Sequence, residues 1–164
     1  MAVGEGPTVL VPGQGKTVSF SGTFSGNGLT FVHGGSDGAY SLVEWDAAPG
    51  APSTPLHLHR ATDEAFYVLQ GTFGFRAGDR TLELSAGSFA FVPRGLEHAY
   101  WNEGPTPAKM LITISPPGLE RYFEELADGL AAVGDDPEAA MSLRKALSEK
   151  HDVEVIGPPR QAAG

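Results

Sequence analysis

Short runs of apolar and β-branched residues alternate with glycine-rich turns over the first 115 positions of the chain. This pattern predicts β-strands, because successive side chains of a strand point to opposite faces. The strands predicted before position 50 are Thr8–Val11, Lys16–Phe20, Leu29–His33 and Ala39–Asp46. The proline-rich segment 49–55 is predicted to be a loop, since proline has no amide proton to donate within a central strand.

Two hairpins are predicted next, from strands 64–69, 72–77 and 80–84 joined across Gln70-Gly71 and Gly78-Asp79. Two-residue turns predict the following cross-strand pairs: Phe66–Phe75 and Val68–Phe73 in the first hairpin, and Phe75–Leu82 and Phe73–Leu84 in the second. Because cross-strand partners share a face, these six residues are expected to form one apolar surface. Glu64 lies at the end of that surface, by the alternation of side chains along its strand.

After strands 88–92, 97–101 and 109–114 the period changes from two residues to that of a helix. The apolar stripe consists of Leu119, Tyr122, Phe123, Leu126 and Leu130. A second helix is predicted from Asp136 as N-cap and Pro137 in the first turn to about Lys150, with Ala140, Leu143 and Leu147 facing inward. The tail, residues 151–159, is predicted to be one short strand or an extended segment that docks on the body of the domain. We predict one domain over residues 1–164, with a β core at about 29–115 and C-terminal helices at about 118–150.

The composition excludes several classes of function. A net charge of −9 argues against nucleic acid and anionic membranes as partners, because both require a basic face. The N-terminal segment lacks the basic start and apolar run of a signal peptide, and no stretch approaches the length of a membrane span. We therefore expect a cytoplasmic protein. The chain has no cysteine, so disulfides, thiolate nucleophiles and sulfur ligands are excluded.

Three of the five histidines lie in two short motifs. The motifs are Gly50-x6-His57-x-His59-x4-Glu64-x6-Gly71 and Gly87-x5-Pro93-x-Gly95-x2-His98-x3-Asn102. Two histidines at positions i and i+2 of a strand project to the same side, close enough to share one ion. Glu64, on the adjoining strand, adds an oxygen ligand, and His98 follows a rigid Pro-x-Gly turn. The pattern predicts a metal centre whose ligands are His57, His59, Glu64 and His98.

The motifs resemble those of the cupin superfamily, G-x5-HxH-x3-4-E-x6-G and G-x5-PxG-x2-H-x3-N. The second matches at every position, and the first has one extra residue before His57. The resemblance covers about residues 39–115. It implies an all-β cupin barrel (a double-stranded β-helix, or jelly roll) with a small C-terminal α-helical extension, one divalent metal ion per chain, and a homodimer. Segment 116–126 and the terminal Val-Ile-Gly-Pro-Pro are similar to bacterial monocupins of the quercetin 2,3-dioxygenase-like group.

Three imidazoles and one carboxylate suit Ni, Co, Mn, Fe or Zn. On an octahedral ion they leave two positions for substrate and for O₂ or water, which favours catalysis over a closed structural zinc site. Our leading hypothesis is a metal-dependent, quercetinase-like dioxygenase acting on a planar enolic or phenolic molecule such as a flavonol. Glu64 is expected to be both ligand and general base. An aromatic wall of Phe66, Phe73 and Phe75 is expected to bind the planar body of the substrate.

Two other classes of function remain open on this sequence. One is a redox-neutral cupin enzyme, such as an isomerase, cyclase or decarboxylase, that uses the metal as a Lewis acid. Native zinc would favour that class. The other is a non-catalytic small-molecule-binding cupin, against which the retained carboxylate and the open coordination positions both argue. In the leading hypothesis the partners are a small aromatic molecule and O₂.

Overall fold

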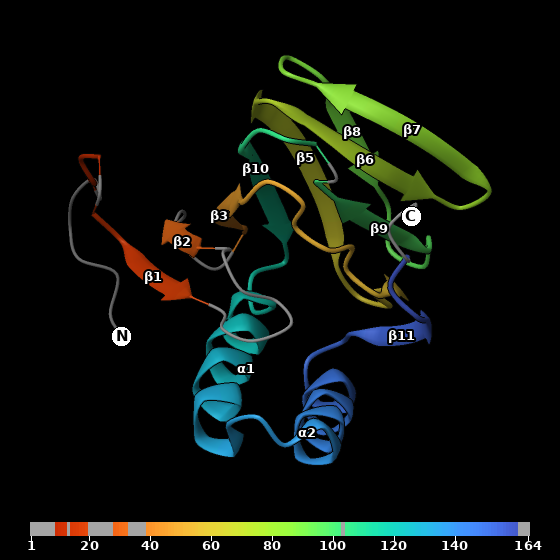
Figure 1. Ribbon diagram of the computed structural model, residues 1–164. Helices are drawn as coiled ribbons and strands as arrows, with labels where there is room; N and C mark the ends of the chain where they lie inside the picture. Colours follow the sequence, from red (N-terminus) through yellow and green to blue (C-terminus); the bar gives the residue numbers. More distant parts are fainter. Residues whose placement is uncertain (1–8, 13, 20–27, 33–38, 103, 161–164) are drawn as a thin grey trace.

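Two antiparallel β-sheets face each other, and two helices lie across one end of them (Figure 1). The computed structural model describes residues 9–12, 14–19, 28–32, 39–102 and 104–160. The first sheet contains, in spatial order, β1 (Lys16–Ser19), β2 (Gly28–Val32), β3 (Ser41–Ala47), β10 (Ala108–Ser115), β5 (Asp63–Gln70) and β8 (Phe89–Val92). The second contains β11 (Glu154–Gly157), β4 (Leu56–Leu58), β9 (His98–Trp101), β6 (Thr72–Ala77) and β7 (Arg80–Ser85).

The strands at the centre of the first sheet bury every second residue, as the period of two predicts. β3 and β10 alternate strictly between buried and half-buried positions along their whole length. Their inward side chains include Val43, Trp45, Met110 and Ile112, which pack in the core between the sheets. This arrangement confirms the predicted all-β class with a small helical extension at the C-terminus.

One predicted strand does not form. Val9, Leu10 and Val11 are irregular, while Thr8 lies outside the described residues. Their side chains are exposed, from 38% at Leu10 to 73% at Val9. Strand propensity depends on packing against neighbours, and these residues have no paired strand among the described part of the chain. Two predicted strand ends, Phe20 and His33, also lie outside the described residues.

The predicted hairpin across Gln70-Gly71 is wrong, because β5 and β6 belong to different sheets. β5 pairs with β8 and β10, so Phe66 lies opposite Ala90 and Ile112 instead of Phe75. The chain passes between the sheets at Gly71, which has a left-handed φ of 72°. A Cβ there would lie 2.8 Å from Ala108 Cβ, so the crossing needs glycine.

The second predicted hairpin is confirmed. β6 and β7 pair with Phe75 opposite Leu82 and Phe73 opposite Leu84, across the two-residue turn Gly78-Asp79. The predicted apolar surface therefore exists as two facing surfaces. Phe66 in one sheet meets Phe75 in the other with ring centroids 5.0 Å apart. Alternation along a strand identifies the inward side chains, but it does not tell which sheet each strand joins.

The chain after residue 117 forms a C-terminal extension, here residues 118–157, that covers one end of the sheets (Figure 1). It contains α1 (Glu120–Val133), α2 (Pro137–Lys150) and β11. Asp136 caps α2 as predicted, since its side chain accepts from the amides of Glu138 and Ala139. Neither helix is long and apolar enough to span a membrane. The predicted docking of the tail is confirmed, because β11 pairs with β4.

Candidate metal centre

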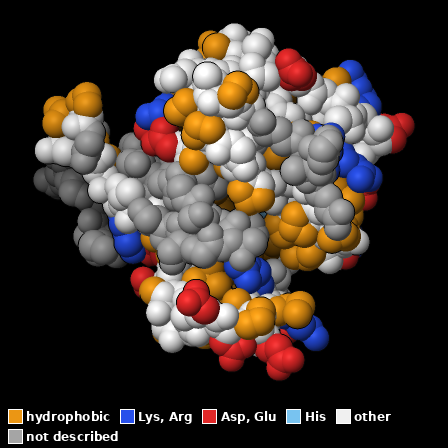
Figure 2. Space-filling model, in the orientation of Figure 1, with side chains coloured by type: hydrophobic (Ala, Val, Ile, Leu, Met, Phe, Trp, Pro, Cys, Tyr) orange, Lys and Arg blue, Asp and Glu red, His pale blue; other side chains and the backbone are white. Residues whose placement is uncertain are grey.

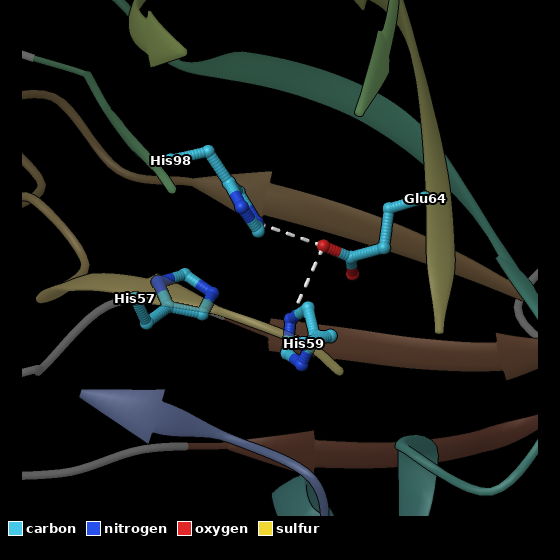
Figure 3. A group of neighbouring side chains, drawn as sticks. All are labelled: His57, His59, Glu64 and His98. Atoms are coloured by element: carbon cyan, nitrogen blue, oxygen red, sulfur yellow. Dashed lines mark hydrogen bonds and ion pairs between the residues drawn. The ribbon is translucent and has the colours of Figure 1, made fainter. Parts of the chain in front are cut away.

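The four predicted ligands meet between the two sheets (Figure 3). His57 lies in β4 and His98 begins β9, and the two are direct cross-strand partners. His59 follows β4 by one residue. Glu64 lies on β5 in the facing sheet, so the expectation of an adjoining strand is wrong. One possible ligand atom from each of the four residues lies within 4.8 Å of the others.

The two motifs are held together by backbone geometry as well as by their ligands. The amide of Gly95, in the turn before His98, donates to the carbonyl of His59 at 2.6 Å. Gly95 has a φ of 83°, a conformation that glycine adopts without strain. Asn102, buried at the end of the second motif, donates from Nδ2 to the carbonyl of Thr106 at 2.9 Å. The Pro-x-Gly turn therefore places His98 against the first motif.

Backbone carbonyls orient all three imidazoles. The Nδ1 atoms lie 2.8 Å from Pro55 O in His57, 2.6 Å from Asp152 O in His59 and 3.2 Å from Leu96 O in His98. A carbonyl oxygen can only accept, so Nδ1 carries a proton in each ring. Nε2 then faces the centre, and this is the orientation in which a neutral imidazole binds a metal through Nε2.

Glu64 is the acidic centre of the group. Its Oε2 lies 2.8 Å from His98 Nε2 and 3.4 Å from His59 Nε2, and the side chain is 5% exposed. Burial acts to raise the pKa of Glu64, but the contacts with His59 and His98 outweigh it and hold the pKa well below its usual range. The carboxylate is therefore ionised at neutral pH.

The surroundings of the cluster lower the pKa of His57 and raise the pKa of His59. Burial, together with the neighbouring His98 and His59, lowers the pKa of His57 to about 3. Burial also acts to lower the pKa of His59, but the contacts with Glu64 and with the carbonyl of Asp152 raise it above its ordinary value. His57 is therefore neutral over the physiological range and ready to act as a ligand.

The residues fit a divalent transition metal. Among the described residues, none accepts from or donates to the buried Nε2 of His59 through a hydrogen bond. A buried nitrogen without such a partner is costly, and a metal ion would satisfy it. His98 Nε2 and Glu64 Oε2 lie 2.8 Å apart, and both atoms have lone pairs that a metal ion could accept. The group is capable of binding a metal, and its nitrogen and oxygen donors match the predicted candidates.

A small cavity of about 60 Å³ adjoins the cluster. Its walls are formed by Thr54, Pro55, Tyr100, Leu119, Tyr122, Phe123, Val153 and Val155, together with His57, His59 and Glu64. The C-terminal extension therefore contributes the outer wall. Burial and the charge of Glu64 raise the pKa of Tyr100, so its hydroxyl keeps its proton and can donate a hydrogen bond.

The predicted aromatic wall is not part of this cavity. Phe66, Phe73 and Phe75 are at most 1% exposed and pack in the core between the sheets. The reason is the sheet crossing at Gly71, which turns these faces toward each other. The aromatic residues that do line the cavity on the side of the extension are Tyr122 and Phe123. The helical spacing of the apolar stripe predicted that Tyr122 and Phe123 face inward. It did not indicate that they face the metal ligands.

A much larger groove of about 950 Å³ lies outside the cavity, between α2 and β11. It shares Pro55, Val153 and Val155 with the inner cavity, so these three residues separate the two spaces. Hydrophobic side chains gather over this part of the surface in Figure 2. They include Met141, which is 67% exposed, and the tail prolines 158 and 159.

Residues 43–114 match the family model of the cupin domain. Both motifs lie inside this stretch. The β sandwich also resembles an RmlC-like cupin from Shewanella frigidimarina, with a TM-score of 0.57 and 22% identity over 68% of this chain and 93% of that chain. The polyketide cyclase RemF from Streptomyces resistomycificus has the same fold, with a TM-score of 0.57 and 22% identity over 68% of this chain and 81% of that one. The chain therefore contains a cupin domain over residues 43–114.

Two curated relatives are similar in sequence. Auxin-binding protein ABP19b of Prunus persica is 36% identical over 107 residues, which are 62% of this chain and 46% of that protein. The tetracenomycin polyketide synthase protein TcmJ of Streptomyces glaucescens is 32% identical over 71 residues, which are 43% of this chain and 47% of that protein. The chain spans about half the length of the curated relatives it matches.

Proposed function

We propose that this protein is a metal-dependent enzyme that oxygenates a planar enolic or phenolic small molecule, with O₂ as the second substrate. The observation that carries the proposal is the cluster of three imidazoles and one carboxylate beside a cavity with aromatic residues in its wall. A divalent ion held by these four residues would supply Lewis-acid or redox chemistry. A flavonol is a suitable test substrate, because it combines an acidic hydroxyl with a planar apolar body.

The chain's own residues have distinct roles in this proposal. Glu64 is ionised, because the neighbouring imidazoles hold its pKa low, and it accepts the proton of the substrate hydroxyl. Tyr100 keeps its proton and donates a hydrogen bond to a substrate oxygen. Leu119, Tyr122 and Phe123 exclude water from the reacting atoms.

The two spaces at the site suggest how a planar substrate binds. A cavity of about 60 Å³ holds no more than a reacting group, whereas sites for whole ligands usually measure roughly 300–1,000 Å³. The groove of about 950 Å³ is in that range and is separated from the cavity by Pro55, Val153 and Val155. In our proposal the planar body binds in the groove, and a small displacement of these three residues admits the hydroxyl-bearing ring.

A redox-neutral reaction, such as cyclisation of a phenolic polyketide, is the second candidate. The similarity to TcmJ favours it, because that relative is named as a polyketide synthase protein. The contact of 2.8 Å between Glu64 and His98 also supports proton transfer that needs no oxidant. In either reaction Glu64 takes the proton of an enol or phenol, so the two candidates share one base and differ in their use of O₂.

Elemental analysis followed by oxygen-electrode measurements with quercetin tests the proposal. We expect one divalent metal per chain and O₂ uptake that matches substrate loss, with both absent in His98→Ala. Substrate loss that continues without O₂ would support the redox-neutral candidate instead. Quercetin binding without turnover, in the fully loaded protein, would point to a binding protein and overturn the proposal.

A further inference from the structure

Asp152, between α2 and β11, makes four hydrogen bonds with residues 59–62 of the first motif. Its backbone has a left-handed φ of 57°. Among the described residues, Asp152 is the only one other than glycine with a positive φ. Its carbonyl accepts from His59 Nδ1 at 2.6 Å, the shortest of the three carbonyl contacts to the imidazoles. Residues other than glycine rarely adopt this left-handed backbone conformation, and they keep it only where surrounding contacts hold the backbone in place.

The carboxylate of Asp152 organises the turn between two ligands. Oδ1 accepts from the amide of Arg60 at 2.8 Å, while Oδ2 accepts from the amide of Ala61 at 2.9 Å and the hydroxyl of Thr62 at 3.1 Å. This turn connects His59 to Glu64. The carboxylate therefore fixes the path of the chain between one imidazole ligand and the carboxylate ligand.

Neighbouring residues attach the same part of the extension to the first motif. Arg60 and Glu154 form an ion pair, with Arg60 Nε and a terminal guanidinium nitrogen 2.8 and 2.7 Å from Glu154 Oε2. In β11, Val155 lies opposite His57. Both histidines of the first motif are thus in contact with residues 152–155, which are remote in sequence.

We propose that Asp152 is a positioning residue of the metal centre, through which the C-terminal extension raises the affinity for metal. Partners behind a metal ligand fix its ring orientation and typically change metal affinity by about 10–100-fold. Because linkage is reciprocal, a bound metal must also stabilise the extension. The inference rests on metal binding by the cluster and is independent of which reaction the metal supports.

Two substitutions test the side chain of Asp152 with residues that tolerate its left-handed backbone conformation. Asp152→Gly tolerates the left-handed φ and removes the carboxylate, whereas Asp152→Asn also tolerates it and keeps one acceptor oxygen. The matched control is Glu125→Ala, which removes ion pairs to Lys150 and His151 within the same extension. None of the described contacts of Glu125 reaches residues 57–64.

The first measurement is Co²⁺ affinity together with the visible spectrum of the Co²⁺-loaded protein, which reports ligand geometry. We expect Asp152→Gly to weaken binding by about 10–100-fold and to shift the spectrum. Asp152→Asn should lie between it and the wild type, and Glu125→Ala should match the wild type. Wild-type affinity and spectrum in Asp152→Gly would overturn the inference, as would an equal loss in Glu125→Ala. If Asp152→Gly does not fold, wild-type affinity in Asp152→Asn overturns it.

The second measurement is amide hydrogen exchange over residues 137–157, with and without Co²⁺. We expect the metal to slow exchange in the wild type and in Glu125→Ala, but much less in Asp152→Gly. Equal exchange rates in this segment of the wild type with and without Co²⁺ would contradict the coupling. A wild-type protein that binds Co²⁺ with these effects but consumes no O₂ would overturn the proposed reaction and leave this inference standing.

Discussion

His57 and His98 are direct cross-strand partners in the β4–β9 pair, and their ring centroids lie 4.3 Å apart. Each ring comes from a different sequence motif, so the register of one strand pair joins the two halves of the metal centre. Glu64 completes the group from the facing sheet, with Oε2 2.8 Å from His98 Nε2. The ligand set therefore depends on the pairing of β4 with β9 and on the packing of the two sheets.

Replacement of His98 tests the ligand set. We expect His98→Ala to lose stoichiometric metal and to keep its β-sheet circular dichroism, because the aromatic core does not depend on the ion. His151→Ala is the control, since His151 lies outside the cluster and contacts Glu125. The ligand assignment fails if purified His98→Ala still holds one tightly bound metal per chain.

Glu64→Gln tests the base. The amide keeps the size and one acceptor oxygen but removes the charge, so we expect metal to be retained at least in part and turnover to fall by about 10²–10⁴-fold. Turnover is measured on variants loaded to the same metal content. Wild-type turnover in a fully loaded Glu64→Gln protein would remove Glu64 from the proton transfer.

Phe75→Ala separates a core role from a substrate role. The ring of Phe75 is 1% exposed and faces Phe66, so its loss should cost about 3–5 kcal/mol of unfolding free energy, measured by urea denaturation. Phe89→Ala is the matched control, because Phe89 is 64% exposed and should change stability by about 0.5 kcal/mol or less. Equal losses in the two variants would contradict the placement of Phe75 in the core.

Phe123→Ala tests the cavity on the side of the extension. The shorter side chain should enlarge the space beside the cluster, so we expect tighter binding of quercetin to the metal-loaded protein, measured by fluorescence titration. The exposed Met141 lines the outer groove, and Met141→Ala should weaken the same binding if the planar body lies there. Unchanged affinity in both variants would place the ligand elsewhere.

The lowered pKa of the half-buried His57 predicts a pH dependence of stability in the metal-free protein. Its pKa is about 3 in the folded chain against an ordinary value of 6.5, so the unfolded chain takes up the proton first. The stabilisation from neutral His57 is complete above about pH 6.5 and is lost as the pH falls toward 3. We expect His57→Leu to reduce the proton uptake on unfolding between pH 6 and 4, measured by urea denaturation at several pH values. An identical pH dependence in the two proteins would contradict this.

The sequence predicted the local features of the centre better than its three-dimensional assembly. The spacing of His57 and His59, the cap at Asp136 and the hairpin across Gly78-Asp79 all depend on neighbours in the chain, and the structure has them as predicted. The sheet to which β5 belongs depends on long-range pairing, so the expected Phe66–Phe75 strand pair was wrong. The backbone contact from Asp152 to His59 joins residues 93 positions apart and has no signature in side-chain type.

The ligands of the centre come from both sheets, and this has a mechanical consequence. Glu64 lies on β5 in one sheet, while β4 and β9 of the other sheet hold His57 and His98, so an ion held by these residues would cross-link the sheets. The link between Glu64 and His98 would close a loop between residues 34 positions apart. Closing such a loop removes conformations from the unfolded chain, much as a disulfide does. In a protein without cysteine, a single ion would thus act as a reversible cross-link, which acid or a chelator removes.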